Sequence, residues 1–447
     1  MAKTGREAIL DQAVADGIRY MFGNPGTVEQ GFLDAMAKQP GCRYILALQE
    51  SIAVGMADGY ARALHKPALV QLHSGVGLGN GVGMMYQALR GHAPLVVIAG
   101  ESGIKYDAMD AQMACDLVAI AKPVTKWATR VIDPASVLRV MRRAVKIAST
   151  PPCGPVFVCL PADVLDAPNT EEVFPSTTLT TRVLPEPGHV AHAASLLAGA
   201  KKPIVIKGDG VAYSDGQAEL TRLAELLGAE VWGSDCSEVN IADEHPCYRG
   251  QLGHMFGSHS SAITTQADAV LIVGTYVFPE VFPNLSNVFA KGAKVVHVDL
   301  NAYEIAKNFP VDLGLVADPK ATLARITDSL DLLMTAAQKD AARARVAAMG
   351  SEKERTRSEA LAKDRAVRDE VHDMKQLEIR CTGDRAEVKL CVNWQAKVWN
   401  PPAAKSIWLG FDAYQTWMVI RSPKSGKPVI QTYIVDSLKP MPGSATL

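Results

Sequence analysis

The sequence has no run of apolar residues near the roughly 18 that a membrane-spanning helix requires. Its first residues, Met1 to Glu7, lead into a mixed helical pattern and not into the apolar core of a signal peptide. It also has no excess of positive charge, since the formal net charge is -1, and this gives no electrostatic reason to expect nucleic-acid binding. We therefore expect a cytoplasmic protein that acts without a membrane or a nucleic acid.

Two further kinds of motif are missing. None of the 8 cysteines forms a C-x-x-C pair, so we expect reduced cysteines and neither a disulfide framework nor a zinc site. No Walker loop occurs, and the glycines from Gly75 to Gly81 fail the dinucleotide pattern G-x-G-x-x-G in every frame. With Gly75 as the first glycine, for example, the sixth position is Asn80.

The fold class predicted from the pattern is α/β, with two doubly wound parallel-sheet domains followed by a small β-rich module. A chain of 447 residues usually forms more than one domain. Apolar strands alternate with helical segments up to about residue 335, which is typical of parallel sheets covered on both faces. We expect a first domain over residues 1–165, a central domain over 190–335, a charged helical linker over 336–375 and the β-rich module over 376–447.

In the first domain the capping-box spacing of Thr4 and Glu7 predicts the start of a helix, and Thr27 is placed to cap a second one. The strands expected there are 19–22, 44–48, 68–72, 94–99, 124–131 and 155–160. Those expected in the central domain are 203–207, 230–232, 269–273, 294–298 and 314–316.

The β-rich module is expected to begin with a hairpin around Gly383-Asp384, because alternating segments flank that dipeptide. Further strands are expected at 406–409, 417–421 and 428–435. Trp394, Trp399, Trp408 and Trp417 could form a binding face, although packing into a core is the more common use of aromatic residues.

Three loops of the first domain each follow an expected strand. They contain Asn24-Pro25-Gly26-Thr27, Gln49-Glu50-Ser51 and the glycine-rich stretch from His73 to Asn80. Because ligands of parallel sheets bind outside the carboxyl ends of the strands, these loops should meet at one functional edge.

The residues alone leave two uses open for each feature. The glycines allow a ligand close to the backbone, or tight packing of a helix on a strand. Glu50 could exchange a proton with a ligand, or could be only a first-turn acidic residue favoured by the helix dipole.

These motifs together resemble a known family. Gly23-Asn24-Pro25-Gly26-Thr27, then Glu50, then Met56-Ala57-Asp58-Gly59-Tyr60-Ala61-Arg62 and Leu72-His73-Ser74-Gly75 look like the pyrimidine-binding domain of thiamine-diphosphate enzymes. The match is closest to the benzoylformate decarboxylase and acetolactate synthase branch. Lys202-Pro203-Ile204-Val205-Ile206 and Val296-His297-Val298-Asp299 resemble the central domain of that family, so the resemblance covers about residues 1–345.

The resemblance implies thiamine diphosphate as cofactor and a 2-keto acid as substrate, with decarboxylation or carboligation as the reaction. The glutamate that matches Glu50 bonds the aminopyrimidine ring and favours the imino tautomer that deprotonates the thiazolium. His73 matches an acid/base histidine, although a histidine at this position could also simply bond the backbone. The implied catalytic residues are Glu50 and His73. The implied cofactor contacts are Asn24, Pro25, Gly26, Glu50, Gly77 and Asn80, and the implied substrate contacts are Thr27, His73 and Ser74.

The sequence departs from the family where the third domain should follow. That domain carries Gly-Asp-Gly and a later asparagine for Mg²⁺ and the diphosphate, a kind of site that suits oxygen ligands. Gly208-Asp209-Gly210 with Asn240 matches in letters, but it ends the first strand of the central domain, and Thr382-Gly383-Asp384-Arg385 lacks the second glycine. We therefore expect no metal ligands in this chain.

Mg²⁺ is accordingly expected only with a partner chain that supplies the diphosphate-binding domain. A homo-oligomer, a dimer or tetramer, is also expected from the family. The alternative is a non-catalytic binding or assembly protein built from a truncated or fused relative. FAD binding by the central domain, as in the acetolactate synthase branch, is a third option that no residue here supports.

Overall fold

The computed structural model describes residues 3–234, 237–275, 278, 280–367, 371–398, 407–422 and 426–445. They form two compact units, Met1–Arg345 and Val346–Leu447, and each is described by itself. No helix within the described residues is long and apolar enough to cross a membrane.

The first sheet has six parallel strands in the order β3-β2-β4-β5-β7-β6. Its strands are β2 (Tyr20–Gly23), β3 (Arg43–Leu46), β4 (Ala68–Leu72), β5 (Leu95–Glu101), β6 (Trp127–Arg130) and β7 (Val156–Pro161). The helices are α1 (Gly5–Ala15), α2 (Gln30–Lys38), α3 (Glu50–Leu64), α4 (Ser74–Arg90), α5 (Leu117–Ala121), α6 (Val137–Ser149) and α7 (Ala162–Asp166), with short 3-10 turns at Ile104–Met109, Lys122–Val124 and Pro134–Ser136.

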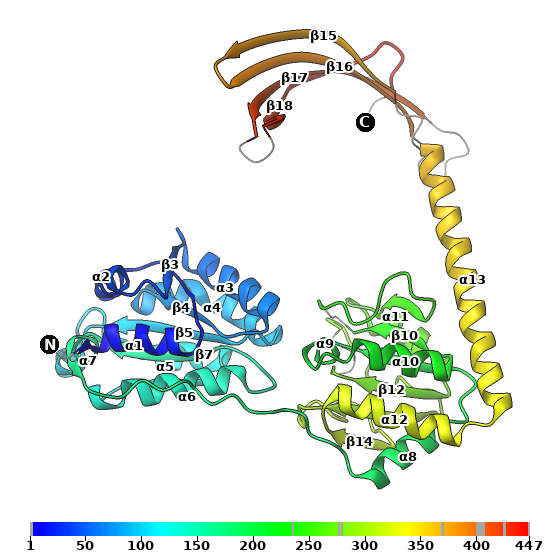
Figure 1. The fold of residues 1–447 in the computed structure, drawn as a ribbon, viewed down its shortest axis with the longest axis horizontal. Helices are drawn as coiled ribbons and strands as arrows, with labels where there is room; N and C mark the ends of the chain where they lie inside the picture. The colour runs from blue at the N-terminus through cyan, green and yellow to red at the C-terminus, as the bar shows by residue number, and fades with distance from the viewer. Residues whose placement is uncertain are drawn as a thin grey trace. The chain divides into compact units, whose positions relative to one another are not determined.

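Helices cover both faces of this sheet, as its buried central strands require (Figure 1). Ile9 of α1 and Leu138 of α6 pack on one face, and Val54 of α3 and Met85 of α4 pack on the other. The predicted capping box opens α1, where Thr4 accepts a hydrogen bond from the Glu7 backbone and the Glu7 carboxylate accepts one from the Thr4 backbone. The expected α/β architecture is therefore confirmed.

The second sheet is also parallel, in the order β11-β10-β9-β12-β13-β14. Its strands are β9 (Pro203–Lys207), β10 (Glu230–Gly233), β11 (Tyr248–Gln251), β12 (Ala269–Val273), β13 (Lys294–Asp299) and β14 (Leu313–Val316). The helices are α8 (Pro187–Leu197), α9 (Gly210–Tyr213), α10 (Gln217–Leu227), α11 (Gly257–Thr264) and α12 (Pro319–Leu333).

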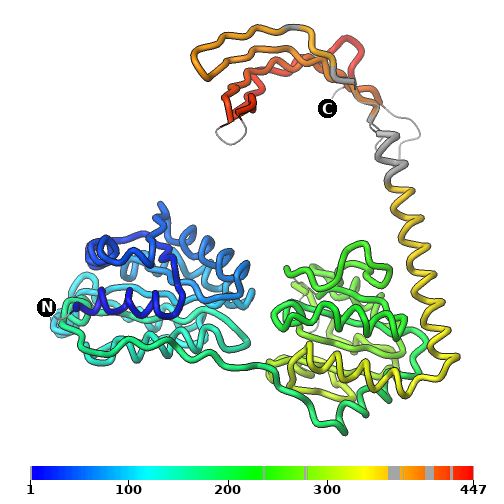
Figure 2. Tube along the Cα trace, viewed as in Figure 1, coloured from blue at the N-terminus to red at the C-terminus, as the bar shows by residue number. Residues whose placement is uncertain are grey.

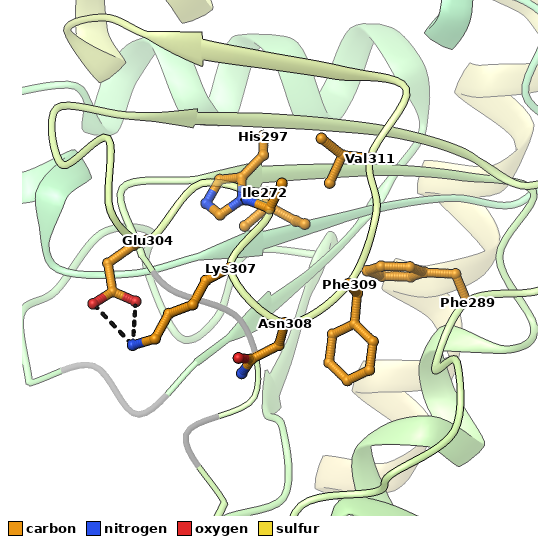
Figure 3. Close-up of a pocket in the computed structure, with 9 residues that line it drawn as sticks. Ile272, Phe289, His297, Glu304, Lys307, Asn308, Phe309 and Val311 are labelled. Atoms are coloured by element: carbon orange, nitrogen blue, oxygen red, sulfur yellow. Dashed lines mark hydrogen bonds and ion pairs between the residues drawn. The ribbon is translucent and has the colours of Figure 1, made fainter.

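His297 of β13 is fully buried and serves the structure of this second sheet. Its Nε2 lies 2.9 Å from the Thr275 carbonyl, and burial lowers its pKa. Figure 3 shows it beside a small cavity lined by Phe289, Phe309 and other residues. The cavity volume is about 10 Å³, roughly the room that one water molecule needs.

Three expectations for this unit need correction. Thr27 does not cap α2, because the helix begins at Gln30 and its N-cap residue is Glu29. Strand β11 and helix α11 were not predicted. The segment of about residues 165–190 between the first and central domains, rich in proline and threonine and expected as a linker without strands, contains β8 (Pro168–Asn169), which pairs antiparallel with β1 (Lys3–Thr4).

The second unit contains most of the long helix α13 (Ala336–Val367) and a four-stranded antiparallel sheet in the order β15-β16-β17-β18. The strands are β15 (Val371–Thr382), β16 (Arg385–Val398), β17 (Ile407–Arg421) and β18 (Pro428–Pro440). They are long and visibly bowed in Figure 2.

The predicted hairpin at Gly383-Asp384 is confirmed, with Gly383 at a positive φ of 60°. Two expectations for this unit were wrong. Strand β15 begins at Val371, inside the range expected to be helical, and one strand, β17, replaces the two expected at 406–409 and 417–421. Trp399 lies outside the described residues.

Candidate functional site

Three loops of the first domain meet at the carboxyl ends of neighbouring strands. The sheet order places β2 between β3 and β4. Asn24 follows β2, Glu50 begins α3 after β3, and His73 follows β4 as the N-cap residue of α4. The structure thus brings together the loops that the sequence marks, and it does so because parallel strands end at the same edge.

Glu50 is the centre of this edge. Its side chain is buried, with 7% of the residue exposed. Oε1 accepts a hydrogen bond from the Asn24 amide at 3.2 Å, and Oε2 accepts one from the Asn80 amide at 3.0 Å. Asn24 comes from the loop after β2 and Asn80 from helix α4, so together they fix the orientation of the carboxylate.

Each carboxylate oxygen has two lone pairs, so these two bonds leave Glu50 able to bond a further group. Gly77 lies directly beside it. A Cβ at residue 77 would sit 3.1 Å from Glu50 Oε1 and 3.1 Å from the Cβ of His73. A side chain at residue 77 would therefore crowd both Glu50 and His73, so glycine allows the close approach of α4 to these residues, and a role in admitting a ligand stays a prediction.

A buried carboxylate missed by the sequence analysis orients His73. Glu29 is 1% exposed, and its Oε2 lies 2.8 Å from His73 Nδ1. Two backbone N–H groups, of Gly100 at 2.8 Å and of Gly26 at 3.2 Å, also donate to this carboxylate. Since an ionised carboxylate only accepts, Nδ1 is the donor and Nε2 is left to exchange a proton.

His73 Nε2 makes no hydrogen bond within the part of the chain that the structure describes. Gly26 packs directly against the His73 ring, since a Cβ added at residue 26 would lie 2.0 Å from His73 Nδ1. Any side chain at residue 26 would displace the imidazole, so this glycine is required by close approach. The side chain of His73 is 30% exposed, which gives Nε2 access to a ligand.

The remaining candidates are placed less directly. Thr27 is exposed in the turn after Gly26, and Pro25 is half-buried in the same loop. Ser74 has a positive φ of 44°, is buried, and donates its hydroxyl to the Gly100 carbonyl at 3.0 Å. Its hydroxyl is thus committed to the fold, and contact of Ser74 with a substrate stays a prediction.

Two further residues stabilise the segments that carry Asn24 and Glu50. Tyr44 of β3 donates its hydroxyl to the Gln71 side chain beneath the Asn24 loop. Burial, helped by the nearby Glu29 charge, raises the pKa of Tyr44, so the phenol stays a protonated donor. Gln49 caps α3 by accepting from the backbone N–H groups of Ser51 and Ile52, which fixes the first turn that carries Glu50.

Asp209 and Asn240 have structural partners in the central domain. Asp209 accepts from the Ser237 and Glu238 backbones at 2.9 Å each, and Asn240 accepts from the Ala212 backbone at 2.8 Å. These bonds fix the strand-to-helix turn after β9, and the interpretation that Gly208-Asp209-Gly210 is not a metal motif stays a prediction.

Comparison with known proteins gives two family matches. Residues 3–120 match the thiamine pyrophosphate enzyme N-terminal TPP binding domain, and residues 190–326 match the thiamine pyrophosphate enzyme central domain. The benzoylformate decarboxylase of Pseudomonas aeruginosa is 31% identical over 332 residues, which cover 73% of this chain and 62% of that protein. The acetolactate synthase large subunit of Haemophilus influenzae is 30% identical over 329 residues, covering 72% of this chain and 56% of the relative.

Solved structures agree with these matches. The thiamine diphosphate-dependent 4-hydroxybenzoylformate decarboxylase of Rhodococcus jostii is 29% identical with a TM-score of 0.68, over 73% of this chain and 62% of the other. The benzoylformate decarboxylase of Polynucleobacter necessarius is 27% identical with a TM-score of 0.67, over 73% and 61%. The chain therefore spans less than two thirds of the length of these relatives.

Proposed function

This chain belongs, through its N-terminal and central domains, to the thiamine pyrophosphate enzyme family. On that premise we propose that it is part of a thiamine-diphosphate-dependent decarboxylase or carboligase that acts on 2-keto acids in the cytoplasm. The geometry at Glu50 carries this proposal. A buried carboxylate with both oxygens held by amides, beside a glycine that leaves room, suits an aminopyrimidine nitrogen as its further partner.

The residues present fit the pyrimidine half of the cofactor. When bound, the cofactor supplies the electron sink for loss of CO₂ from a 2-keto acid. Glu50 holds a proton-exchanging carboxylate against the ring, and Asn24 and Asn80 prevent it from rotating away. His73, oriented by Glu29, holds or releases a proton at Nε2 on the substrate side. Pro25, Gly26 and Gly77 shape the space between them, and Thr27 and Ser74 are proposed at its substrate end.

We assign the other half of the site to a partner chain. No Gly-Asp-Gly with a later asparagine follows residue 345 in this sequence, and such a motif is where this resemblance places the diphosphate and Mg²⁺. A separate chain would supply both, bound to a dimer or tetramer of this chain. A neighbouring reading frame that encodes that motif would support a split enzyme.

Calorimetric titration of the full chain with thiamine diphosphate and Mg²⁺ tests the proposal. Heat of binding is expected, weak for the chain alone and stronger after addition of a chain that carries the diphosphate-binding domain. Absence of heat at millimolar cofactor in both experiments, with the fold intact by circular dichroism, would contradict it. The products that the mixture forms from benzoylformate and from pyruvate then separate the two reactions, since CO₂ with an aldehyde indicates decarboxylation and CO₂ with a coupled hydroxyketone or acetohydroxy acid indicates carboligation.

A second candidate function is a non-catalytic assembly protein, favoured by the separate four-stranded unit at Val346–Leu447. It predicts that Glu50→Gln leaves the biological role intact and that deletion of residues 376–447 abolishes it.

A flavin in the central domain is a further option. A pocket of about 430 Å³, within the size range of ligand sites, is lined by residues after β9, β10, β12 and β13 and by first-domain residues such as Arg62 and Arg90. A yellow purified protein with flavin absorbance would support it.

A further inference from the structure

The sheet of the second unit has two chemically different faces. Directly paired residues on neighbouring strands point to the same side, so the strand register assigns each residue to a face. One side, here named the apolar face, is defined by Ile379, Val388, Leu390, Trp394, Trp417 and Tyr433. The opposite side carries the charged residues Glu378, Arg380, Glu387 and Lys389.

The apolar face has no charge along its two inner strands. Every second residue from Ala386 to Ala396, and from Ile407 to Val419, points to this side, and each of them is apolar except Gln415. The edge strands extend the face with exposed apolar residues, including Ile379 at 55% and Tyr433 at 64% exposure. On the inner strands Val388, Leu390 and Leu409 are buried, at 8%, 3% and 5% exposure. The exposed apolar surface therefore lies mainly along the two edges of the face, and contiguous exposed apolar surface of this kind marks an interaction site.

One pair of polar groups on this face is bonded within the face. The indole Nε1 of Trp417 donates a hydrogen bond to Gln415 Oε1 at 2.8 Å, and both residues point to the apolar side. Removing water from the face therefore does not strand the indole N–H, which would otherwise cost free energy.

A single sheet needs a second layer to bury an apolar face. In the described part of this unit, the four strands pack extensively only with one another, and α13 does not form such a layer. Strands of 12 to 15 residues, spaced by about 4.8 Å and rising about 3.3 Å per residue, give a face of roughly 800 Å². In plan, the face is thus about as large as the patch that each partner contributes to a stable interface.

We propose that a second copy of this chain covers the apolar face with its own apolar face. Two-fold symmetry places the same uncharged surface on both sides, so no like charges meet and neither sheet needs a complementary charge. Two such faces match each other in area and pack as layers about 10 Å apart. The bowed four-stranded sheet thus becomes half of a sandwich that joins two subunits.

Tyr433→Glu and Thr432→Glu test this proposal on the full chain. The two residues are neighbours on edge strand β18, both are exposed, and each change adds one negative charge. Tyr433 points to the apolar face and Thr432 to the opposite one. The mass of the assembly is measured by light scattering and sedimentation over a dilution series, with circular dichroism to confirm the fold.

We expect Tyr433→Glu to raise the dissociation constant at least about 100-fold, because two unpaired carboxylates would have to enter a dry interface. At a fixed concentration the mass of the assembly then falls by half. Thr432→Glu should assemble as the unchanged protein does. Val435→Glu with Ile434→Glu repeats the comparison at a second pair on the same strand, where Val435 faces the apolar side.

A chain that stays monomeric at high micromolar concentration overturns the proposal, as does equal assembly of the Tyr433→Glu and Thr432→Glu variants. A monomer that binds an apolar dye, and loses this binding in Tyr433→Glu, would assign the face to a partner other than a second copy. None of these outcomes depends on cofactor binding, so they are separate from the test of the proposed function.

Discussion

Replacing Gly77 by alanine tests whether this glycine is needed for cofactor binding beside Glu50 or only for the packing of helix α4. Gly77 and Gly79 both lie in α4, yet an added Cβ meets Glu50 Oε1 at 3.1 Å at residue 77 and meets nothing within 4 Å at residue 79. Glycine to alanine in a helix stabilises by about 1 kcal/mol. Extra volume in a packed region costs about 1 to 3 kcal/mol.

Gly79→Ala should therefore raise the free energy of unfolding by about 1 kcal/mol, while Gly77→Ala should leave it unchanged or lower it by up to about 2 kcal/mol. Urea unfolding followed by circular dichroism measures both. Only Gly77→Ala should also weaken binding of thiamine diphosphate, because the methyl group takes the space beside the carboxylate. Equal stabilisation by the two variants, with equal cofactor binding, would refute the reasoning.

Three other substitutions follow from the same geometry. Glu50→Gln replaces one acceptor oxygen with an amide group that would face an asparagine N–H donor. The affinity for thiamine diphosphate, measured by calorimetry, should therefore fall about 10- to 100-fold. Asp34→Asn removes the same charge at an exposed residue and is the control that should not change the affinity. Glu29→Gln replaces the carboxylate that accepts hydrogen bonds from two backbone N–H groups and from His73, and should lower the free energy of unfolding by about 1 to 3 kcal/mol. An unchanged free energy of unfolding would show that a neutral amide accepts these bonds equally well. Burial raises the pKa of Asp299 to about 6, so the folded state loses stability as pH rises from about 4, where the unfolded carboxyl ionises, to about 6. Asp299→Asn should be more stable than the unchanged protein by about 1 to 3 kcal/mol near pH 8 and no more stable below pH 4, as thermal melts across pH would show.

The sequence was sufficient for the parts of the site that depend on strand ends. Apolar runs located β2, β3 and β4, and parallel pairing brought the residues after them together. It was not sufficient for Glu29, which lies beyond the Asn24 loop and looks like any acidic residue before a helix. Its role depends on the backbone of Gly100, far along the chain, and on the close approach of Gly26 to His73.

The second unit shows another limit. Strand β17 was expected as two short strands because Gly410 and Asp412 interrupt its apolar pattern. Pairing along almost its entire length with β16 keeps it extended through both residues. Local propensity is weak in such a strand, since long-range partners decide the conformation. For the same reason β11 and β8, each held by a distant neighbour, gave no clear signal.

The two asparagine amides that hold Glu50 also connect the loop after β2 to the first turns of α4. Glu50 thus bonds two segments that are 56 residues apart in the sequence, at Asn24 and Asn80, and a change in its bonding reaches both. The side-chain amide signals of Asn24 and Asn80 in a nitrogen-15 spectrum would consequently shift together when a ligand engages the carboxylate. That pair gives the protein a built-in spectroscopic sensor of occupancy, readable without any turnover.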